Sequence, residues 1–183
     1  MTMKALRTVV LSFPFIVSAP AQTAAPARTA VLQVQNGILS TREGHQAFSD
    51  LDAKFAPRNA DLEKRQNEIA ALQEQLRKGG AAMTDDAQRK LARDIDRKTK
   101  ALSYDAETTR ADYEQEQADL MQTLARKFHA VVEKYAKDKE IGLVVDIGNP
   151  QTPAFWWANA MDITNDVVRA YDAAYPAAVK PEH

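Results

Sequence analysis

The stretch that decides the fold, residues 48–76, reads FSDLDAKFAPRNADLEKRQNEIAALQEQL. Large apolar residues recur in it at a strict spacing of seven. They are Phe48, Phe55, Leu62, Ile69 and Leu76, and Leu51 and Leu72 fill companion positions three residues further on. Such a repeat is the a/d seam of a coiled coil, because it lines one side of a helix with apolar side chains. The stretch therefore predicts a long helix that packs lengthwise against a second helix.

A turn and a second helix follow this stretch. Residues 78–84 read KGGAAMT, in which glycine is expected to end the first helix in the left-handed conformation and Thr84 to cap the next helix. The apolar stripe then resumes at Leu91, Ile95, Leu102, Leu120, Met121, Leu124, Phe128, Val131 and Tyr135. The sequence thus predicts a helical hairpin arm over residues 57–138, with its tip at 79–84.

The predicted seam is imperfect. Arg58 and Arg65 occupy companion positions of the first helix, and Lys98 lies on the stripe of the second. From Leu102 the next large apolar residue on the stripe is Tyr113, eleven residues on instead of seven, which relaxes a supercoil locally. These flaws indicate an arm that can bend, and they argue against a permanent, rigid rod.

The arm surface carries acidic residues four positions before basic ones. Each such pair on a helix contributes about 0.2–0.5 kcal/mol, so a series of them supports a thin, solvated helix. The charged run therefore indicates a hydrated face. The pairs are Asp61–Arg65, Glu74–Lys78, Asp85–Arg89, Asp86–Lys90, Asp94–Lys98, Asp96–Lys100 and Glu133–Lys137.

The flanking segments predict a small β body, formed by residues 30–56 and 139–175. Residues 30–35 (AVLQVQ) are typical of a strand, and the helical pattern begins near Ser40. Pro57 is expected to kink the first helix where the body meets the arm, because proline removes a backbone hydrogen bond. The chain is thus expected to be an α+β protein in which the coiled-coil arm projects from this body.

The part of the body after the arm is expected to hold a β-hairpin and a short helix. Gly142 is expected to close the second arm helix, and residues 143–147 and 155–158 to pair around a turn at 148–150. Thr164 is expected to cap a last helix that ends at Tyr175, before a tail at 176–183. So few strands make a marginal core with open edges, which predicts a homo-oligomer whose strands complete one sheet.

The first 21 residues have the pattern of an export signal. Lys4 and Arg7 precede a short apolar run at 9–17, and Ala19-Pro20-Ala21 supplies the small-x-small cleavage pattern. The run is shorter than the ~20 residues of a spanning helix. Cleavage would leave a flexible lead-in at 22–29, and the mature product is expected outside the cytoplasm.

Composition and motifs argue against several functions. The 183 residues have a formal net charge of −1 and include no cysteine, which argues against nucleic-acid binding and excludes thiolate metal sites. His45 and His129 have no histidine partner at helical spacing, and His183 is the last residue. No phosphate loop or nucleophile elbow is present. The sequence predicts neither an enzyme nor a cofactor.

The order of these features resembles the OmpH/Skp family of periplasmic chaperones across nearly the whole mature chain. The resemblance is carried by the first strand, Glu43-Gly44, Phe55-Ala56-Pro57, the arm, and above all by Val144-Val145-Asp146 and Asp162-Ile163-Thr164. It implies a homotrimer whose arms enclose a cavity. Family members hold unfolded outer-membrane β-barrel proteins there, without ATP, and prevent their aggregation.

The resemblance also suggests where contacts lie. Met83 and Tyr113 are interpreted as client-binding residues on the arms. The trimer body is expected to involve Val31, Val34, Val144, Val145 and Trp156. Peripheral contact with a membrane or lipopolysaccharide is left open, because some family members are strongly basic and this mature chain is slightly acidic.

Two other hypotheses stay open. The chain could be a coiled-coil adaptor or structural protein of the cell envelope, although the polar interval near 105–112 argues against a permanent rod. It could also bind carbohydrate or lipid through Trp156 and Trp157, although a pair of this kind more often places one ring in a core and one at an interface.

Overall fold

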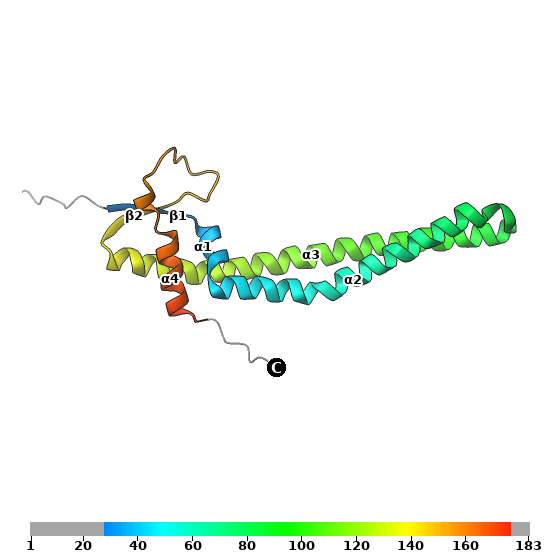
Figure 1. Cartoon of the computed structure of the whole chain (residues 1–183), viewed down its shortest axis with the longest axis horizontal. Coiled ribbons are helices and arrows are strands. Elements are labelled where there is room, and N and C mark those ends of the chain that lie inside the picture. The colour runs from blue at the N-terminus through cyan, green and yellow to red at the C-terminus, as the bar shows by residue number, and fades with distance from the viewer. Residues whose placement is uncertain (1–27, 177–183) are drawn as a thin grey trace, which may run out of the picture.

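The computed structural model describes residues 28–176, so the predicted signal at 1–21, most of the lead-in and most of the tail lie outside the described residues. A small body carries a long arm made of two antiparallel helices (Figure 1). The elements in chain order are β1 (Arg28–Leu32), α1 (Val34–Ser40), α2 (Arg42–Gly79), a 3-10 turn (Gly80–Ala82), α3 (Asp85–Asp138), β2 (Ile141–Asp146), a 3-10 turn (Asn159–Met161) and α4 (Thr164–Ala174).

The helical hairpin predicted from the heptads is confirmed. Thr84 caps α3 as expected, since its hydroxyl accepts a hydrogen bond from the Ala87 amide at 3.3 Å. The expected left-handed glycine is wrong, because Gly79 has φ −100° and Gly80 has φ −55°. The first helix tightens into a 3-10 turn instead, which needs no positive φ.

Pro57 lies inside α2 without breaking it. The helix is continuous from Arg42 to Gly79. Figure 1 shows α2 changing direction in its cyan middle part, whereas α3 runs beside it with less curvature. A bend without a break is what the loss of one backbone hydrogen bond produces in a helix supported by a neighbour.

The sheet has two strands and differs from the predicted hairpin. β1 and β2 are parallel, with Ala30 opposite Val144 and Val31 opposite Val145. The other strand of the predicted hairpin, residues 155–158, is an irregular loop. The second edge of β1 is occupied by the segment before α4, because the Ile163 amide donates to the Val31 carbonyl at 2.9 Å. The aromatic segment 155–158 thus joins neither strand, although β1 is paired on both sides and β2 on one side only.

The chain changes from strand to helix earlier than predicted. β1 ends at Leu32, and the unpredicted helix α1 begins at Val34. Side chains from distant segments accept the amide protons at this point: Asp146 Oδ1 lies 3.2 Å from the Val34 amide, and Thr164 Oγ1 lies 3.0 Å from the Gln33 amide. These acceptors satisfy donors that a new helix leaves unpaired.

Both predicted boundaries after the arm need correction. Thr164 does not cap α4 but is its first residue, and the Asp162 carboxylate accepts from the Thr164 amide at 2.9 Å. Gly142 does not close α3, because it lies in β2, and Glu140 with φ 55° makes the reversal. In both places the boundary is set by a residue close in sequence but different from the predicted one, namely Asp162 in place of Thr164 and Glu140 in place of Gly142.

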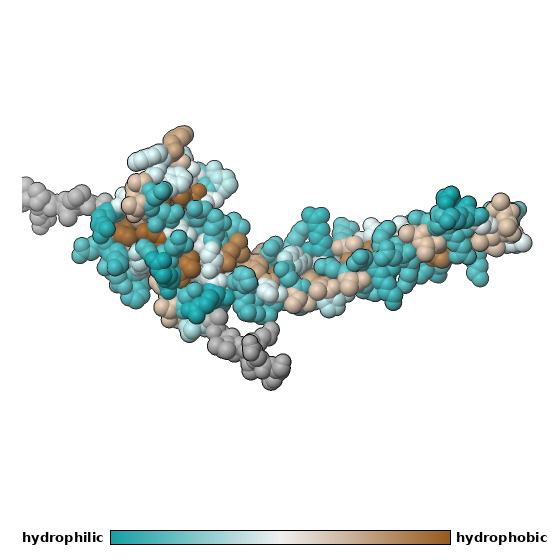
Figure 2. Space-filling view, viewed as in Figure 1, coloured by the Kyte–Doolittle hydropathy of each residue, from teal (hydrophilic) through white to brown (hydrophobic). Residues whose placement is uncertain are grey.

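The core of the body lies where α1, α4 and the base of α3 meet the sheet. Phe128 of α3 is fully buried, and its ring packs 5.9 Å from that of Tyr171. On α4, Val167 and Tyr171 are the residues buried against this core. The other buried residues of this cluster are Ala30, Leu32, Ile38, Leu124, Val131 and Ile163. Figure 2 shows brown apolar side chains concentrated at the body, whereas the arm is mostly hydrophilic.

Four of the seven predicted surface pairs form: Asp61–Arg65, Glu74–Lys78, Asp96–Lys100 and Glu133–Lys137. The other three re-pair, since Arg89 binds Asp86, Arg97 binds Asp94 and Lys98 approaches Glu68 of the other helix. Neighbours three residues apart compete with those four apart on a helix. Within residues 28–176, no helix is both long and apolar enough to cross a membrane.

Replacing Gly44 with alanine is expected to destabilise the body by about 2–3 kcal/mol. A Cβ atom there would lie 2.1 Å from the Ile38 carbonyl oxygen and 2.8 Å from Thr41 Oγ1. That hydroxyl caps α2 by accepting from the Gly44 amide. Urea unfolding followed by circular dichroism measures the loss. Gly79→Ala is the control, because its Cβ would meet only Met83 Cε at 3.6 Å; equal effects of the two changes would contradict the steric argument.

Candidate functional site

The arm presents a seam whose packing changes along its length. Near the body, Phe55 is buried and meets Tyr113 edge to face, with ring centroids 5.3 Å apart. The Tyr113 hydroxyl donates to Asp52 at 2.8 Å. Tyr113, interpreted from the sequence as a client contact, is thus a half-buried part of the seam between α2 and α3, with one edge at the surface.

The middle of the seam contains small side chains. Ala106 and Thr109 complete the stripe of α3 between Leu102 and Tyr113, and both line a concavity together with Leu62 of α2. Its volume is about 360 Å³, and a second concavity of about 480 Å³ lies beside Leu62 and Thr109. The stripe is therefore continuous between Leu102 and Tyr113, but the side chains of Ala106 and Thr109 are too small to fill the space between the two helices.

Ion pairs join the helices where apolar packing is weak. Lys54 binds Glu116 at 2.6 Å, Arg58 binds Asp112 at 2.8 Å and Arg65 binds Asp105 at 2.6 Å. These side chains are all about half exposed, so each pair contributes little free energy. The two arginines that the sequence identified as seam flaws thus link the helices from the rim of the seam.

Thr109→Leu is expected to stabilise the arm by about 1 kcal/mol, because the larger side chain fills the space beside Leu62. Urea unfolding gives the free energy, and hydrogen exchange locates the added protection in the middle of α2 and α3. Thr99→Leu is the matched control, since Thr99 is an exposed position of the same helix and gains the same helix propensity. A gain no larger than that of the control would contradict the packing argument.

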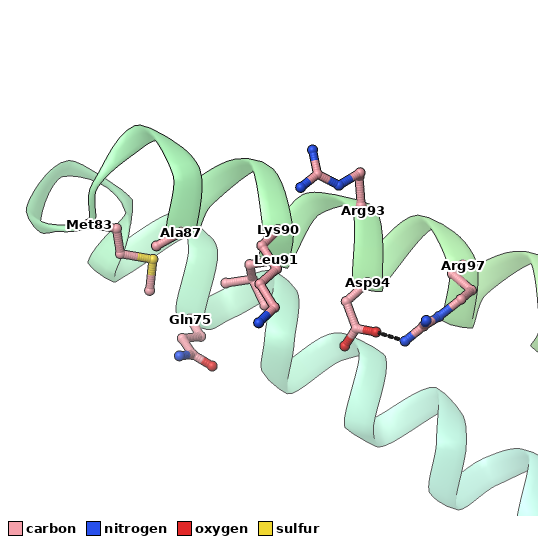
Figure 3. Close-up of a pocket in the computed structure, with 8 residues that line it drawn as sticks. All are labelled: Gln75, Met83, Ala87, Lys90, Leu91, Arg93, Asp94 and Arg97. Atoms are coloured by element: carbon pink, nitrogen blue, oxygen red, sulfur yellow. Dashed lines mark hydrogen bonds and ion pairs between the residues drawn. The ribbon is translucent and has the colours of Figure 1, made fainter.

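The tip of the arm holds a larger groove between α2 and α3. Its volume is about 700 Å³, and Met83, Ala87 and Leu91 supply apolar surface to it. Figure 3 shows these side chains on the side of α3 that faces Gln75 of α2. The remaining lining residues are charged: Lys90, Arg93, Asp94 and Arg97. Met83, interpreted from the sequence as a client contact, thus borders a groove of mixed apolar and basic character.

The residues expected in the trimer body have different exposures. Val31 is buried in the chain's own core, and Val34, Val144 and Val145 are half-buried. Trp156 is 82% exposed. Of these five residues, Trp156 is therefore the one that offers a large free surface.

A charged cluster that the sequence did not identify ties the arm to the body. Glu43 at the start of α2 accepts hydrogen bonds from Lys127 of α3 and from the Tyr171 hydroxyl of α4, the latter at 2.7 Å. Burial alone would raise the pKa of Glu43, but these hydrogen bonds outweigh it and lower that pKa. Burial and the bond to Glu43 raise the pKa of Tyr171 well above its ordinary value. Glu43 is thus a charged anchor that touches three helices.

Chemical sites are not evident in the described part of the chain. Among residues 28–176 no group of three or more histidine, aspartate or glutamate side chains could hold a metal ion. His45 and His129 are exposed, and His183 lies outside the described residues. The features that remain for function are the grooves of the arm and the exposed aromatic loop of the body.

Comparison with known proteins identifies the fold and the family. A crystal structure from Caulobacter crescentus CB15, whose description names an OmpH-like outer membrane chaperone, superposes with a TM-score of 0.65. The two chains are 15% identical, and the alignment covers 90% of this chain and 95% of that one, so the likeness shows the fold. No protein with a curated description matches the chain. The family model for outer membrane protein (OmpH-like) matches residues 28–171, and the chain therefore belongs to the OmpH-like family.

Proposed function

We propose that this protein is an ATP-independent holdase chaperone of the periplasm, which binds unfolded outer-membrane β-barrel proteins and prevents their aggregation. The observation that carries the proposal is the form of the arm. It offers a series of grooves, of about 700, 480 and 360 Å³, in which apolar side chains lie beside charged ones. Such a surface suits weak contact at many points with an extended chain.

The chemistry of the client fits this surface. Barrel strands alternate apolar and polar residues, so in water an unfolded barrel exposes many separate apolar side chains. A groove that shelters a few of them binds weakly, and several grooves along one arm together retain the chain. Release then needs no nucleotide, because each contact is individually weak.

We also propose that the active form is a homotrimer joined through the body. Among residues 28–176 nothing pairs with the outer edge of β2, and Leu143 on it is 55% exposed. The loop at 147–161 contains no charged residue and presents Phe155 and Trp156 at 97% and 82% exposure. Exposed apolar edges of this kind favour association. Membership of the OmpH-like family and the predicted export signal support the proposed periplasmic location and holdase activity.

The holdase proposal is tested with the mature protein and a urea-unfolded barrel protein diluted into buffer. We expect the scattered-light mass to correspond to a trimer that takes up the barrel protein, and turbidity to stay low without ATP. Serum albumin at equal mass is the control for non-specific crowding. Precipitation of the barrel protein beside an intact trimer would reject the proposal, and the hypothesis of a coiled-coil envelope adaptor would then be preferred.

The double change Phe155→Ser and Trp156→Ser is expected to shift the protein from trimer toward monomer by at least tenfold in association constant. Two large side chains would no longer be buried between copies, and each contributes about 1.5–3 kcal/mol when fully buried. Sedimentation equilibrium measures the shift. Tyr104→Ser is the control, since Tyr104 is 70% exposed on the arm. An unchanged trimer in the double variant would remove the loop from the interface.

A further inference from the structure

Charge is unevenly distributed along the arm, although the chain as a whole is nearly neutral. Residues 77–100, which surround the tip, contain eight basic and four acidic residues. Residues 101–123, the middle of α3, contain one basic and six acidic residues. The basic charge of α3 thus gathers toward its outer end, around the groove that Met83 and Leu91 line, whereas its middle is acidic.

Two cations at this groove have no acidic partner in the described part of the chain. Arg97 pairs with Asp94 at 2.5 Å, and Arg89 pairs with Asp86 at 2.7 Å. Lys90 and Arg93 line the groove and form no ion pair among residues 28–176. In Figure 3, Lys90 lies beside Leu91 at the mouth of the groove, and Arg93 projects from the opposite side of α3. The groove therefore has Lys90 beside its apolar surface, and Arg93 adds positive charge from the other side of the same helix.

We infer that this groove binds client segments in which carboxylates stand next to apolar side chains. Apolar side chains fit against Met83, Ala87 and Leu91, and a carboxylate one or two residues away reaches Lys90, while Arg93 adds positive charge nearby. The cations Arg58, Arg65 and Arg110 in the middle of the arm are already paired with carboxylates, so binding is directed to the tip. This inference rests on the proposed holdase function and names the kind of segment that the tip selects.

A segment lying along the arm fits the charges better than a membrane beneath its end. Asp85 and Asp86 begin α3 at the outermost turn, and the Asp86 side chain is 93% exposed. An anionic lipid surface that met the tip end-on would face these two carboxylates first. The cations lie further back along the helix, where an extended peptide can reach them from the side.

The test uses three peptides of about twelve residues with a neutral fluorophore, in which apolar residues alternate with Glu, Gln or Lys. Fluorescence anisotropy with the full mature protein is expected to give the Glu peptide a three- to tenfold lower Kd than the Gln peptide, as expected for one or two exposed ionic contacts. The Lys peptide is expected to bind weakest. In 0.5 M NaCl the difference between the Glu and Gln peptides is expected to shrink toward none.

The double variant Lys90→Gln and Arg93→Gln is expected to abolish the preference for the Glu peptide. Its matched control is Lys134→Gln with Lys137→Gln, which removes equal charge from the body end of α3, where both lysines are already paired. Equal binding of the three peptides, or an equal loss of preference in both variants, would overturn the inference. Binding to phosphatidylglycerol vesicles that needs Lys90 and Arg93, without peptide preference, would reassign the groove to a lipid surface.

The turbidity experiment separates this inference from the proposed function. If the wild type keeps the barrel protein soluble while the peptides bind equally, only the selectivity of the tip is rejected. If the wild type fails with the barrel protein but prefers the Glu peptide in a manner that depends on Lys90 and Arg93, the holdase function is rejected and the groove remains a site for acidic segments.

Discussion

Each helix of the arm has one neighbour within the chain, and this constraint governs the molecule. A helix with one neighbour can bury only a narrow apolar stripe, so the rest of its surface must be hydrated. The stripe is filled unequally: an aromatic pair at Phe55 and Tyr113, small residues at Ala106 and Thr109, and leucines beyond. Where apolar packing is weakest, ion pairs such as Arg65–Asp105 join the helices from outside. The same hydration leaves shallow grooves along the arm, and these are the surface that the proposed function uses.

The arm could be predicted from sequence because its determinants are local. Heptad spacing and the Thr84 cap act over a few residues, and both are found in the structure. The body was predicted less well, because its determinants are distant. α1 begins at Val34 only because Asp146, more than a hundred residues away, accepts the amide proton there. The hairpin predicted between 143–147 and 155–158 does not form, because β2 pairs with β1 in parallel and the aromatic segment stays outside the sheet.

The candidate site shows the same division. The position of the turn placed Met83 at the tip, and in the structure it borders a groove of about 700 Å³. Tyr113 was interpreted as a client-binding residue, and the structure places its ring on the seam between the helices, against the ring of Phe55. Lys90 and Arg93 were not recognised, because single charges on a helix look like an ordinary solvated face. Only the change in charge along α3 distinguishes them. Glu43 was noted only as part of the Glu43-Gly44 family signature. Its role as an anchor could not be predicted, because its partners Lys127 and Tyr171 lie on other helices.

The parallel pairing of β1 with β2 has a consequence for how the chain folds. The whole arm lies between the two strands, so the ladder joins residues more than a hundred positions apart. Closing so long a flexible loop is entropically costly and slow, whereas a helical hairpin forms from contacts near its own turn. Zipping of α2 and α3 from the tip inward brings the ends of the strands together without closing a long flexible loop. This topology favours an order in which the arm folds first and the body, with any surface that joins it to other copies, is completed last.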